Sequence, residues 1–390
     1  MSHKLPKDAQ AATVAVRAAL DSDTQFGAVV PPIHLSSTYT FAGFGERRAY
    51  DYSRSANPTR DALAEALAAL EQGAGAVITA SGMAAVNLCC QLLKPGDVVI
   101  APHDCYGGTY QLFDSLNKRG LIQTLFVDYR DAAAVASAMQ RKPKLVWVET
   151  PSNPLLRITD IQSVGAQAHA AGALFAVDNT FLSPVWQQPI KLGADLVVHS
   201  TTKYLNGHSD VVGGAVVAAT KELHEQLVWW ANCTGVTASP FDSYLTLRGV
   251  RTLHARMAVH GENALLIAQL LARHPAVKQV YFPGLNTHPQ HELAQRQQSA
   301  FGAMVSFELA GLSQVRAFID GLQLFSLAES LGGVESLIAH PATMTHSAIS
   351  AEARAGAGIT DGLLRLSVGI EDWDDLARDL HAALERAAQA

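Results

Sequence analysis

The stretch 174–204 reads LFAVDNTFLSPVWQQPIKLGADLVVHSTTKY and contains two apolar runs that both end in polar residues. LFAVDN (174–179) and LVVHS (196–200) are near-continuous apolar segments, which is typical of strands buried on both faces of a sheet. Asp178 and Lys203 stand just past the apolar part of each run, 25 residues apart. This is the length of one strand–helix–strand unit, so the sequence predicts that both side chains face one pocket.

Five more apolar runs surround this unit and alternate with helical segments. They are AVITA (76–80), DVVIA (97–101), TLFVD (124–128), LVWVET (145–150) and GAVVA (214–218). Alternation of strands and helices predicts a mostly parallel sheet with helices on both faces. We therefore expect an α/β fold with a mostly parallel seven-stranded sheet.

The rest of the chain divides into an irregular beginning and a mixed end. Residues 1–60 are rich in turn formers, which predicts an arm that contacts a neighbouring subunit. Residues 61–255 form the large domain, which starts with a helix ending at Gly73. Residues 256–390 begin with a long helical pattern and continue with strands such as AMVSFEL and LLRLSVGI, which indicates a smaller C-terminal α+β domain.

Composition excludes several classes of function. The 390 residues are 48% hydrophobic and 16% charged, with a formal net charge of −6, so no basic excess favours nucleic acid or a membrane surface. The start lacks the long apolar run of a signal peptide, and no segment could span a bilayer. The four cysteines show no zinc-site spacing, and we expect no metal. These features predict a cytoplasmic protein.

The carboxyl ends of strands in an open α/β sheet are where ligands bind, and the residues there carry a chemistry. Asp178 ends an apolar strand, and a carboxylate buried there needs a cation as its partner. The alternative is that Asp178 is the N-cap of a helix. A pyridinium nitrogen is such a cation, and pyridoxal 5'-phosphate (PLP) has one. Lys203 follows a buried strand, so it is either an amine nucleophile toward an aldehyde or an ordinary exposed lysine.

Other strand ends offer a phosphate cradle and a stacking ring. Ser81-Gly82-Met83-Ala84 opens a helix, whose free amides suit a phosphate, although ordinary turns look alike. Tyr106 is followed by glycines that leave room for a flat ring, or it is a plain core or surface tyrosine. Ser200 and Thr202 bring hydroxyl groups. Each signal is weak alone, and together they predict a PLP site at one sheet edge.

A rival chemistry is a serine–lysine acyl enzyme, because Ser200 and Lys203 have the Ser-x-x-Lys spacing. That class also needs Ser-Asp-Asn and Lys-Thr-Gly motifs. Ser209-Asp210 is followed by Val211, and Lys-Thr-Gly is absent from the sequence. This alternative therefore lacks two of its three motifs.

Ordered motifs along essentially the whole chain resemble the Cys/Met-metabolism PLP enzymes of fold type I. They are YSR (52–54) with NPTR (57–60), SGM (81–83), YGGT (106–109), ETPSNP (149–154), VDNT (177–180), HSTTKY (199–204) and AESLGGVESL (328–337). Within that family, AVVPPIHLSSTY (28–39) and PHDCYGG (102–108) resemble the bacterial γ-synthases.

The resemblance implies a role for each cofactor-binding residue. Lys203 would bond to the cofactor aldehyde as a Schiff base and, with Tyr106, would be catalytic. Asp178 would pair with the ring nitrogen, and Tyr106 would stack on the ring. The phosphate would be held by Gly82, Met83, Ser200 and Thr202. Tyr52 and Arg54 would reach the phosphate in a neighbouring subunit, within a homotetramer built as a dimer of dimers with shared active sites.

The resemblance also implies the substrate side of the site. Arg365 would bind the α-carboxylate, a bidentate task that suits a guanidinium. Asn153 and Ser330 would assist it, and Glu329 marks γ-chemistry over β-lyase chemistry. The implied reaction joins L-cysteine to O-succinyl- or O-acetyl-L-homoserine in methionine biosynthesis.

Two alternatives to this γ-replacement stay open. Ser55 stands where the succinyl-using synthases often carry an extra arginine, and in this respect it resembles the γ-lyases, which cleave cystathionine. A non-catalytic PLP-binding regulator on the same scaffold is disfavoured because every catalytic position is filled.

Overall fold

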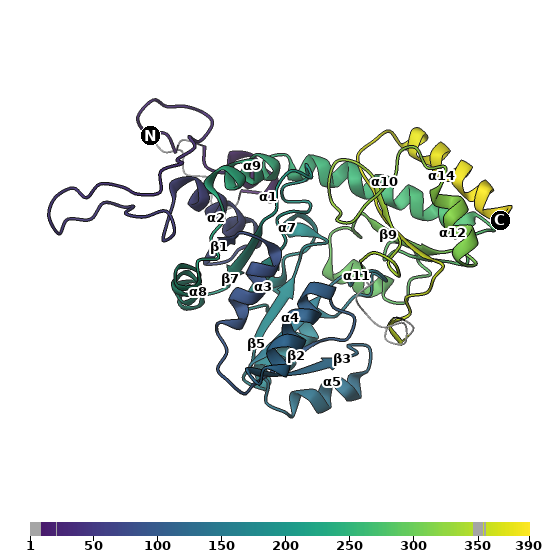
Figure 1. Cartoon of the computed structure of the whole chain (residues 1–390), viewed down its shortest axis with the longest axis horizontal. Helices are drawn as coiled ribbons and strands as arrows, with labels where there is room; N and C mark the ends of the chain where they lie inside the picture. The colour runs from purple at the N-terminus through teal and green to yellow at the C-terminus, as the bar shows by residue number, and fades with distance from the viewer. Residues whose placement is uncertain (1–8, 21, 346–353, 355) are drawn as a thin grey trace.

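The computed structural model describes residues 9–20, 22–345, 354 and 356–390. Two sheets organise this part of the chain (Figure 1). The first sheet has seven strands in the order β1 (Gly75–Thr79), β7 (Gly214–Ala218), β6 (Leu196–His199), β5 (Leu174–Asp178), β4 (Leu145–Glu149), β2 (Asp97–Pro102) and β3 (Ile122–Val127). Only β7 runs antiparallel to its neighbours, so the predicted mostly parallel seven-stranded sheet is confirmed.

Helices cover both faces of this sheet because its strands are apolar on both sides. In β4, Val146 and Val148 pack into one hydrophobic cluster, whereas Trp147 packs into another on the opposite face. The first cluster includes residues of α2, α5, α6 and α10, and the second includes residues of α3, α4 and α8. The bounds of these helices are α2 (Pro58–Glu71), α3 (Gly82–Cys90), α4 (Gly107–Lys118), α5 (Ala132–Met139), α6 (Ile161–Ala170), α8 (Lys221–Thr234) and α10 (Leu253–Arg273).

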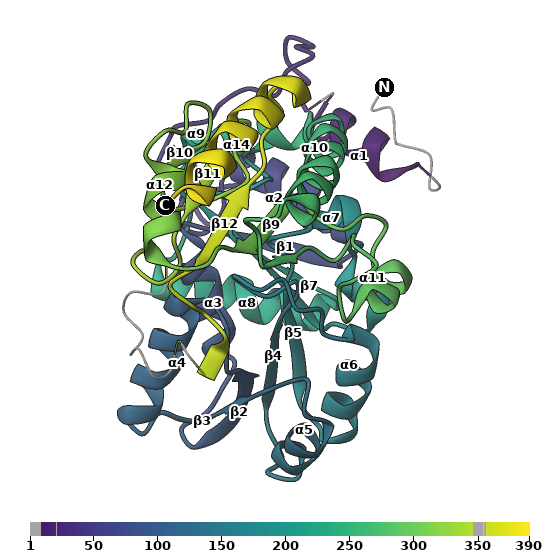
Figure 2. The same cartoon turned by 90° about the vertical axis from the view of Figure 1, so that its right-hand side faces the viewer.

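The second sheet consists of five shorter strands, mostly antiparallel. Their order is β10 (Ser326–Leu327), β11 (Leu337–Ala339), β12 (Leu363–Ser367), β9 (Met304–Glu308) and β8 (Gln279–Tyr281). It lies above the first sheet in Figure 2, with α14 packed on its outer side. The remaining helical elements are α1 (Ala11–Arg17), α7 (Ser183–Trp186), a 3₁₀ helix (Pro189–Leu192), α9 (Pro240–Val250), α11 (His291–Gln297), α12 (Leu312–Ile319) and α14 (Trp373–Ala388).

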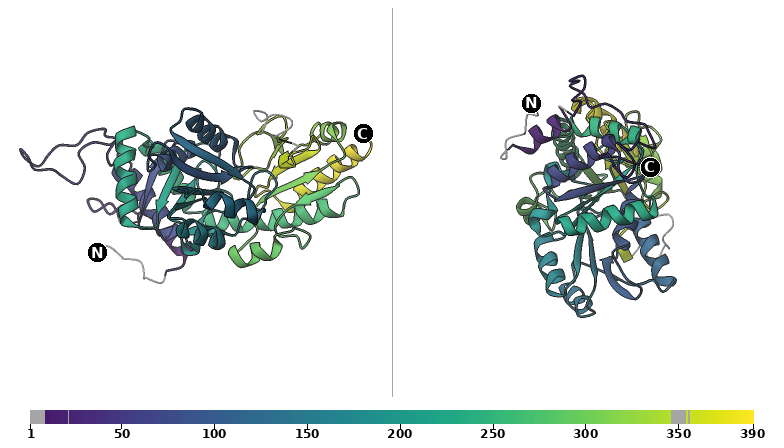
Figure 3. Two further views of the ribbon diagram at one scale, coloured as in Figure 1. Left: turned by 90° about the horizontal axis from the view of Figure 1, so that it is seen from below. Right: turned by 90° about the vertical axis from the view of Figure 1, so that its left-hand side faces the viewer.

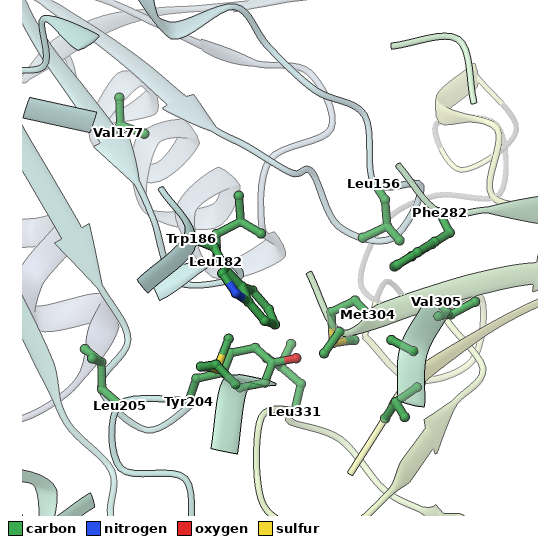
Figure 4. Packing of buried hydrophobic residues seen from close by; sticks show 14 of the residues in the cluster. Leu156, Val177, Leu182, Trp186, Tyr204, Leu205, Phe282, Met304, Val305 and Leu331 are labelled. Carbon is green, nitrogen blue, oxygen red and sulfur yellow. The ribbon is translucent and has the colours of Figure 1, made fainter. Parts of the chain in front are cut away.

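One hydrophobic cluster joins the two sheets. Trp186 and Tyr204 lie beside Leu331 and Met304 (Figure 4). Trp186 and Tyr204 come from connections of the first sheet, whereas Met304 is in β9 and Leu331 lies between β10 and β11. Burial of apolar surface contributes roughly 25 cal/mol per Å². Burial of this shared cluster therefore holds the two sheets together.

Within the segment before α2, α1 packs on the body with Ala15 buried, whereas the chain between α1 and α2 extends away from it (Figures 1 and 3). It carries large exposed apolar side chains, among them Phe26 and Phe44. The sequence places the start of regular structure at residue 61, but α2 begins three residues earlier, at Pro58. The reason is the Asn57 side chain, which accepts hydrogen bonds from the amides of Thr59 and Arg60, with proline at the first helical position.

None of the described helices is long and apolar enough to cross a lipid bilayer.

Candidate active site

A cavity of about 510 Å³ opens where the carboxyl ends of the first sheet meet the second sheet. It brings together nearly all residues that the sequence singles out. Those that line it are Gly82, Met83, Tyr106, Asn153, Asp178, Ser200, Thr202, Lys203, Glu329, Ser330 and Arg365. Tyr52 and Arg54 are exposed and do not line it.

Lys203 lies in the turn after β6, and its amine is partly removed from water. Its Nζ lies 2.5 Å from Ser330 Oγ, which comes from the second half of the chain. Burial and the nearby Arg365 guanidinium lower the pKa of Lys203 to about 8, although Glu329 works against this shift. About a tenth of this amine is therefore uncharged at pH 7, far more than for an ordinary lysine, and only the uncharged amine is nucleophilic.

Asp178 is the last residue of β5 and stands in register with Glu149 of β4. Burial raises the pKa of Asp178, while hydrogen bonding by Thr180 and the charge of His199 lower it. The Thr180 amide donates to Asp178 Oδ1 at 2.9 Å. A buried carboxylate with these partners suits a cationic ligand atom.

Glu149 is a site residue that the sequence analysis missed. Its two oxygens accept hydrogen bonds from the Tyr106 amide at 2.7 Å and from Trp147 Nε1 at 3.1 Å. Burial and the charge of Asp178 raise the pKa of Glu149 well above its usual range. The signal was available, because Glu149 ends a buried strand in the same way as Asp178.

The phosphate cradle forms at the start of α3. The Ser81 hydroxyl accepts from the Ala84 amide and caps the helix. Gly82 approaches Ser200 closely, since a Cβ at Gly82 would lie 2.9 Å from Ser200 Cβ. The Thr202 hydroxyl hydrogen-bonds the carbonyl and amide of Gly213, so it must turn its hydrogen away from Gly213 to donate to a phosphate.

Tyr106 lies at the start of α4, with its side chain 48% exposed. A Cβ at Gly108 would lie 2.7 Å from the Tyr106 ring and 2.8 Å from Met83 Sδ. The glycine thus allows the tyrosine ring and Met83 to stand side by side. The ring remains partly open toward the cavity.

Arg365 belongs to β12 and brings a buried guanidinium to the cavity. Its Nη1 donates to Asn153 Oδ1 at 2.8 Å, and its Nη2 donates to the Ser330 carbonyl at 3.0 Å. Its buried Nε has no hydrogen-bond partner among the described residues. Burial lowers the pKa of Arg365 to about 10, so it stays charged at neutral pH and has a donor to spare for an anion.

A family model described as Cys/Met metabolism PLP-dependent enzyme matches residues 12–385. The chain belongs to this family. The cystathionine γ-synthase of Escherichia coli K12 is 58% identical over 378 residues, which cover 96% of this chain and 98% of that protein. The cystathionine γ-lyase of Bacillus subtilis 168 is 48% identical over 373 residues, with the same shares covered.

Solved structures agree with this assignment. A structure of cystathionine γ-synthase from Xanthomonas oryzae pv. oryzae in complex with cystathionine has a TM-score of 0.97 at 63% identity, over 99% of this chain and 100% of that chain. The family's cofactor is PLP, and the predicted cofactor is therefore confirmed.

The residues present fit this cofactor. Lys203 offers an amine of lowered pKa for the aldehyde, and Asp178 offers a buried carboxylate for the ring nitrogen. The first turn of α3 offers amides for the phosphate. The spare Nε of Arg365 fits the carboxylate of an amino acid held next to it.

Proposed function

We propose that this protein is a PLP-dependent cystathionine γ-synthase. It exchanges the acyloxy group on Cγ of O-succinyl-L-homoserine or O-acetyl-L-homoserine for the thiol sulfur of L-cysteine. The products are L-cystathionine and succinate or acetate, as in methionine biosynthesis. The observation that carries the proposal is one cavity in which a lysine of lowered pKa, a buried carboxylate and a buried guanidinium converge.

We assign a task in this reaction to each predicted residue that lines the cavity. The bound cofactor supplies a conjugated ring that accepts the negative charge formed at the substrate's Cα. Lys203, once its amine is free, takes the proton from Cα and then moves a proton at Cβ, so that the γ-substituent can leave. Arg365 and Asn153 hold the α-carboxylate, which fixes the Cα–H bond toward the lysine.

The tasks at the ring fall to other side chains. Asp178 would hold the proton on the ring nitrogen, and Tyr106 would pack against the ring. Gly82, Met83, Ser200 and Thr202 would hold the phosphate. Glu329 lines the same cavity, and we assign it to the side chain of the substrate that carries the γ-substituent. If water takes the place of cysteine, the products are 2-oxobutanoate, ammonia and the free acid.

The second candidate is cystathionine γ-lyase, and one observation favours it. Arg365 is the sole arginine among the described residues that line the cavity, so a succinyl carboxylate finds no second guanidinium there. Ser55 of the arm hydrogen-bonds Asn232 and adds no charge. The identities favour the synthase, because the E. coli synthase is more similar than the B. subtilis lyase.

One experiment separates the candidates. Purified holoenzyme receives O-succinylhomoserine with cysteine, O-acetylhomoserine with cysteine, or cystathionine alone, and products are identified by mass spectrometry. A synthase forms cystathionine in the first or second mixture. Cysteine formed from cystathionine alone, with no product in the other mixtures, would establish the lyase instead.

We further propose a homotetramer in the cytoplasm, with the arm (residues 1–60) completing a neighbour's site beside the large domain (61–255) and the C-terminal domain (256–390). Exposed Phe26 and Phe44 support a partner surface. Arg54 hydrogen-bonds the Asn232 carbonyl in α8 and does not line its own cavity. Light scattering tests the mass, and an arm-truncated variant that keeps full activity would refute the shared site.

A further inference from the structure

Ser306 is a fully buried polar residue of β9, in the second sheet, and it does not line the cavity. Its Oγ donates a hydrogen bond to the carbonyl oxygen of Pro154 at 2.6 Å. Pro154 lies in the connection that follows β4 of the first sheet, 152 positions earlier in the chain. The hydrogen bond therefore joins the second sheet to the first half of the chain, next to Asn153, which does line the cavity.

Ser306 and Arg365 reach the same connection from one face of the second sheet. They are directly paired in the antiparallel ladder of β9 and β12, and residues paired in this way have their side chains on the same face. Arg365 Nη1 donates to Asn153 Oδ1 at 2.8 Å, whereas Ser306 holds the carbonyl of the next residue. Two neighbouring side chains of the sheet thus bind two consecutive residues of the connection.

An apolar contact extends this attachment by one more residue. Leu155 is buried in a small cluster with Leu363 and Ile359. Leu363 stands two residues before Arg365 in β12, so its side chain lies on the same face of the strand as the guanidinium. Residues 153, 154 and 155 are therefore each held by the second half of the chain.

The internal hydrogen bonds of the connection do not supply this attachment. The Ser152 amide donates to the Arg157 carbonyl at 2.9 Å, and the Leu156 amide donates to the Ser152 carbonyl at 3.0 Å. Both bonds lie within the connection, so they set its shape and not its distance from β12. Among the described residues, Ser306 is the only one of the second sheet that hydrogen-bonds the backbone of residues 152–155.

The position of Asn153 decides which part of Arg365 is left for a ligand. With Nη1 on Asn153 and Nη2 on the Ser330 carbonyl, Nε is the guanidinium nitrogen that has no partner among the described residues. A guanidinium is a rigid plane, so a displaced Asn153 lets the whole group turn and carries Nε with it. Hydrogen bonds weaken steeply when their angle departs from linear, and a small rotation therefore costs binding strength.

We propose that Ser306 is a positioning residue for substrate binding: its hydrogen bond to the Pro154 carbonyl holds Asn153 in place, and Asn153 in turn keeps Arg365 Nε directed at the α-carboxylate. Ser306 lies outside the cavity, so its effect passes through Asn153 to Arg365. This inference rests on the proposed function, in which Arg365 binds the α-carboxylate of the substrate.

The test compares two ligands that differ only in the α-carboxylate. L-Norleucine is an α-amino acid without a leaving group on Cγ, and 1-aminopentane is the same molecule without its carboxyl group. The dissociation constant of each ligand from holoenzyme is measured by isothermal titration calorimetry, so the readout does not depend on turnover. Wild-type holoenzyme should bind norleucine more tightly, because only norleucine offers an anion to Arg365.

In Ser306→Ala this preference for norleucine should fall about three- to tenfold, as expected for the loss of one hydrogen bond of ordinary strength. Ser243→Ala is the matched control. Ser243 is also fully buried and its Oγ donates to the Ser239 carbonyl at 2.8 Å, but it lies in α9 and does not line the cavity. The control should keep the wild-type preference. Equal weakening of both ligands in Ser306→Ala, which is the result of a purely structural role, would overturn the inference.

A double variant ties the effect to Asn153. In an Asn153→Ala background, Ser306→Ala should leave the preference unchanged, because the side chain through which Ser306 acts no longer reaches Arg365. A further fall in this background would contradict the proposed route. Wild-type holoenzyme that does not prefer norleucine would instead refute the role of Arg365 in the proposed function, so the two failures are distinguishable.

A crystal structure of wild-type holoenzyme with L-norleucine covers the case in which Ser306→Ala does not fold. Ser306 Oγ should stay within hydrogen-bond distance of the Pro154 carbonyl while Arg365 Nε contacts the ligand's carboxylate. A structure in which Arg365 binds the carboxylate but Ser306 has left Pro154 would refute the positioning role.

Discussion

The Arg365→Lys substitution is the sharpest test of how the substrate is held. The guanidinium uses Nη1 for Asn153 and Nη2 for the Ser330 carbonyl, which leaves Nε for a carboxylate. A lysine keeps the charge, but its single nitrogen cannot serve all three directions. One charge-assisted hydrogen bond contributes about 1.5–3 kcal/mol, so the loss predicts roughly a 10- to 150-fold weaker hold on the carboxylate.

The kinetic form of this loss follows from the chemistry. The α-carboxylate does not react, so its hydrogen bonds are equally strong in the ground state and the transition state. Their loss should raise KM for O-succinylhomoserine, and it should also lower kcat, because the same hold directs the Cα–H bond toward Lys203. The assay is the initial rate of cystathionine formation at saturating cysteine, measured over a range of acylhomoserine concentrations.

Two controls make the result specific. Arg157→Lys is the matched variant, because Arg157 pairs with Asp104 in a separate cavity, and its KM should not change. For the binding step, 3-aminopropyl succinate lacks the α-carboxylate, and wild type and Arg365→Lys should bind it with equal inhibition constants. A fall in kcat at unchanged KM, or equal weakening of the carboxylate-free ligand, would refute the assigned role of Arg365.

Three other predictions concern the cofactor half of the site. Lys203→Ala should abolish turnover, and borohydride reduction should leave a pyridoxyl mass on the Lys203 peptide of wild type alone; a labelled variant peptide would contradict this. Gly82→Ala should weaken PLP binding about tenfold or more by its contact with Ser200, whereas Gly356→Ala, with open space around it, should not. In apoprotein the folded pKa of Lys203 is about 8 and the unfolded value about 10.5, so the unfolded chain binds more protons between these values and stability rises with pH there. Lys203→Met should therefore have a higher free energy of unfolding than wild type by roughly 3 kcal/mol below pH 8. Urea titrations should show this difference in free energy disappearing by pH 10.5. A difference that does not change with pH would contradict the prediction.

The sequence predicts the sheet well because its strands are buried on both faces. Runs such as LFAVDN leave little doubt about their structure, and their carboxyl ends identify Asp178 and Lys203. Boundaries are less certain, since capping decides them: Asn57 starts α2 before its apolar pattern begins, and β3 begins at Ile122 where residue 124 is expected.

Contacts between distant segments could not be predicted from local patterns. Ser306 and Pro154 are 152 residues apart, and neither lies in a motif that points to the other. The hydrogen bond between Arg365 Nη1 and Asn153 joins residues 212 positions apart. The hydrogen bonds between the Thr202 hydroxyl and the backbone of Gly213 could not be predicted either, because the sequence does not show which backbone groups lie near that hydroxyl.

The origin of the cavity walls has a consequence for how such enzymes diversify. Asp178, Lys203 and the start of α3 come from the first sheet and its connections, whereas Glu329, Ser330 and Arg365 come from the chain after residue 320. Apart from Asn153, which supports Arg365, the groups that handle the cofactor and those that select the amino acid are thus encoded in separate stretches of gene. Mutation of the later stretch can redirect the enzyme toward another amino acid while the earlier stretch keeps its electron-accepting apparatus intact.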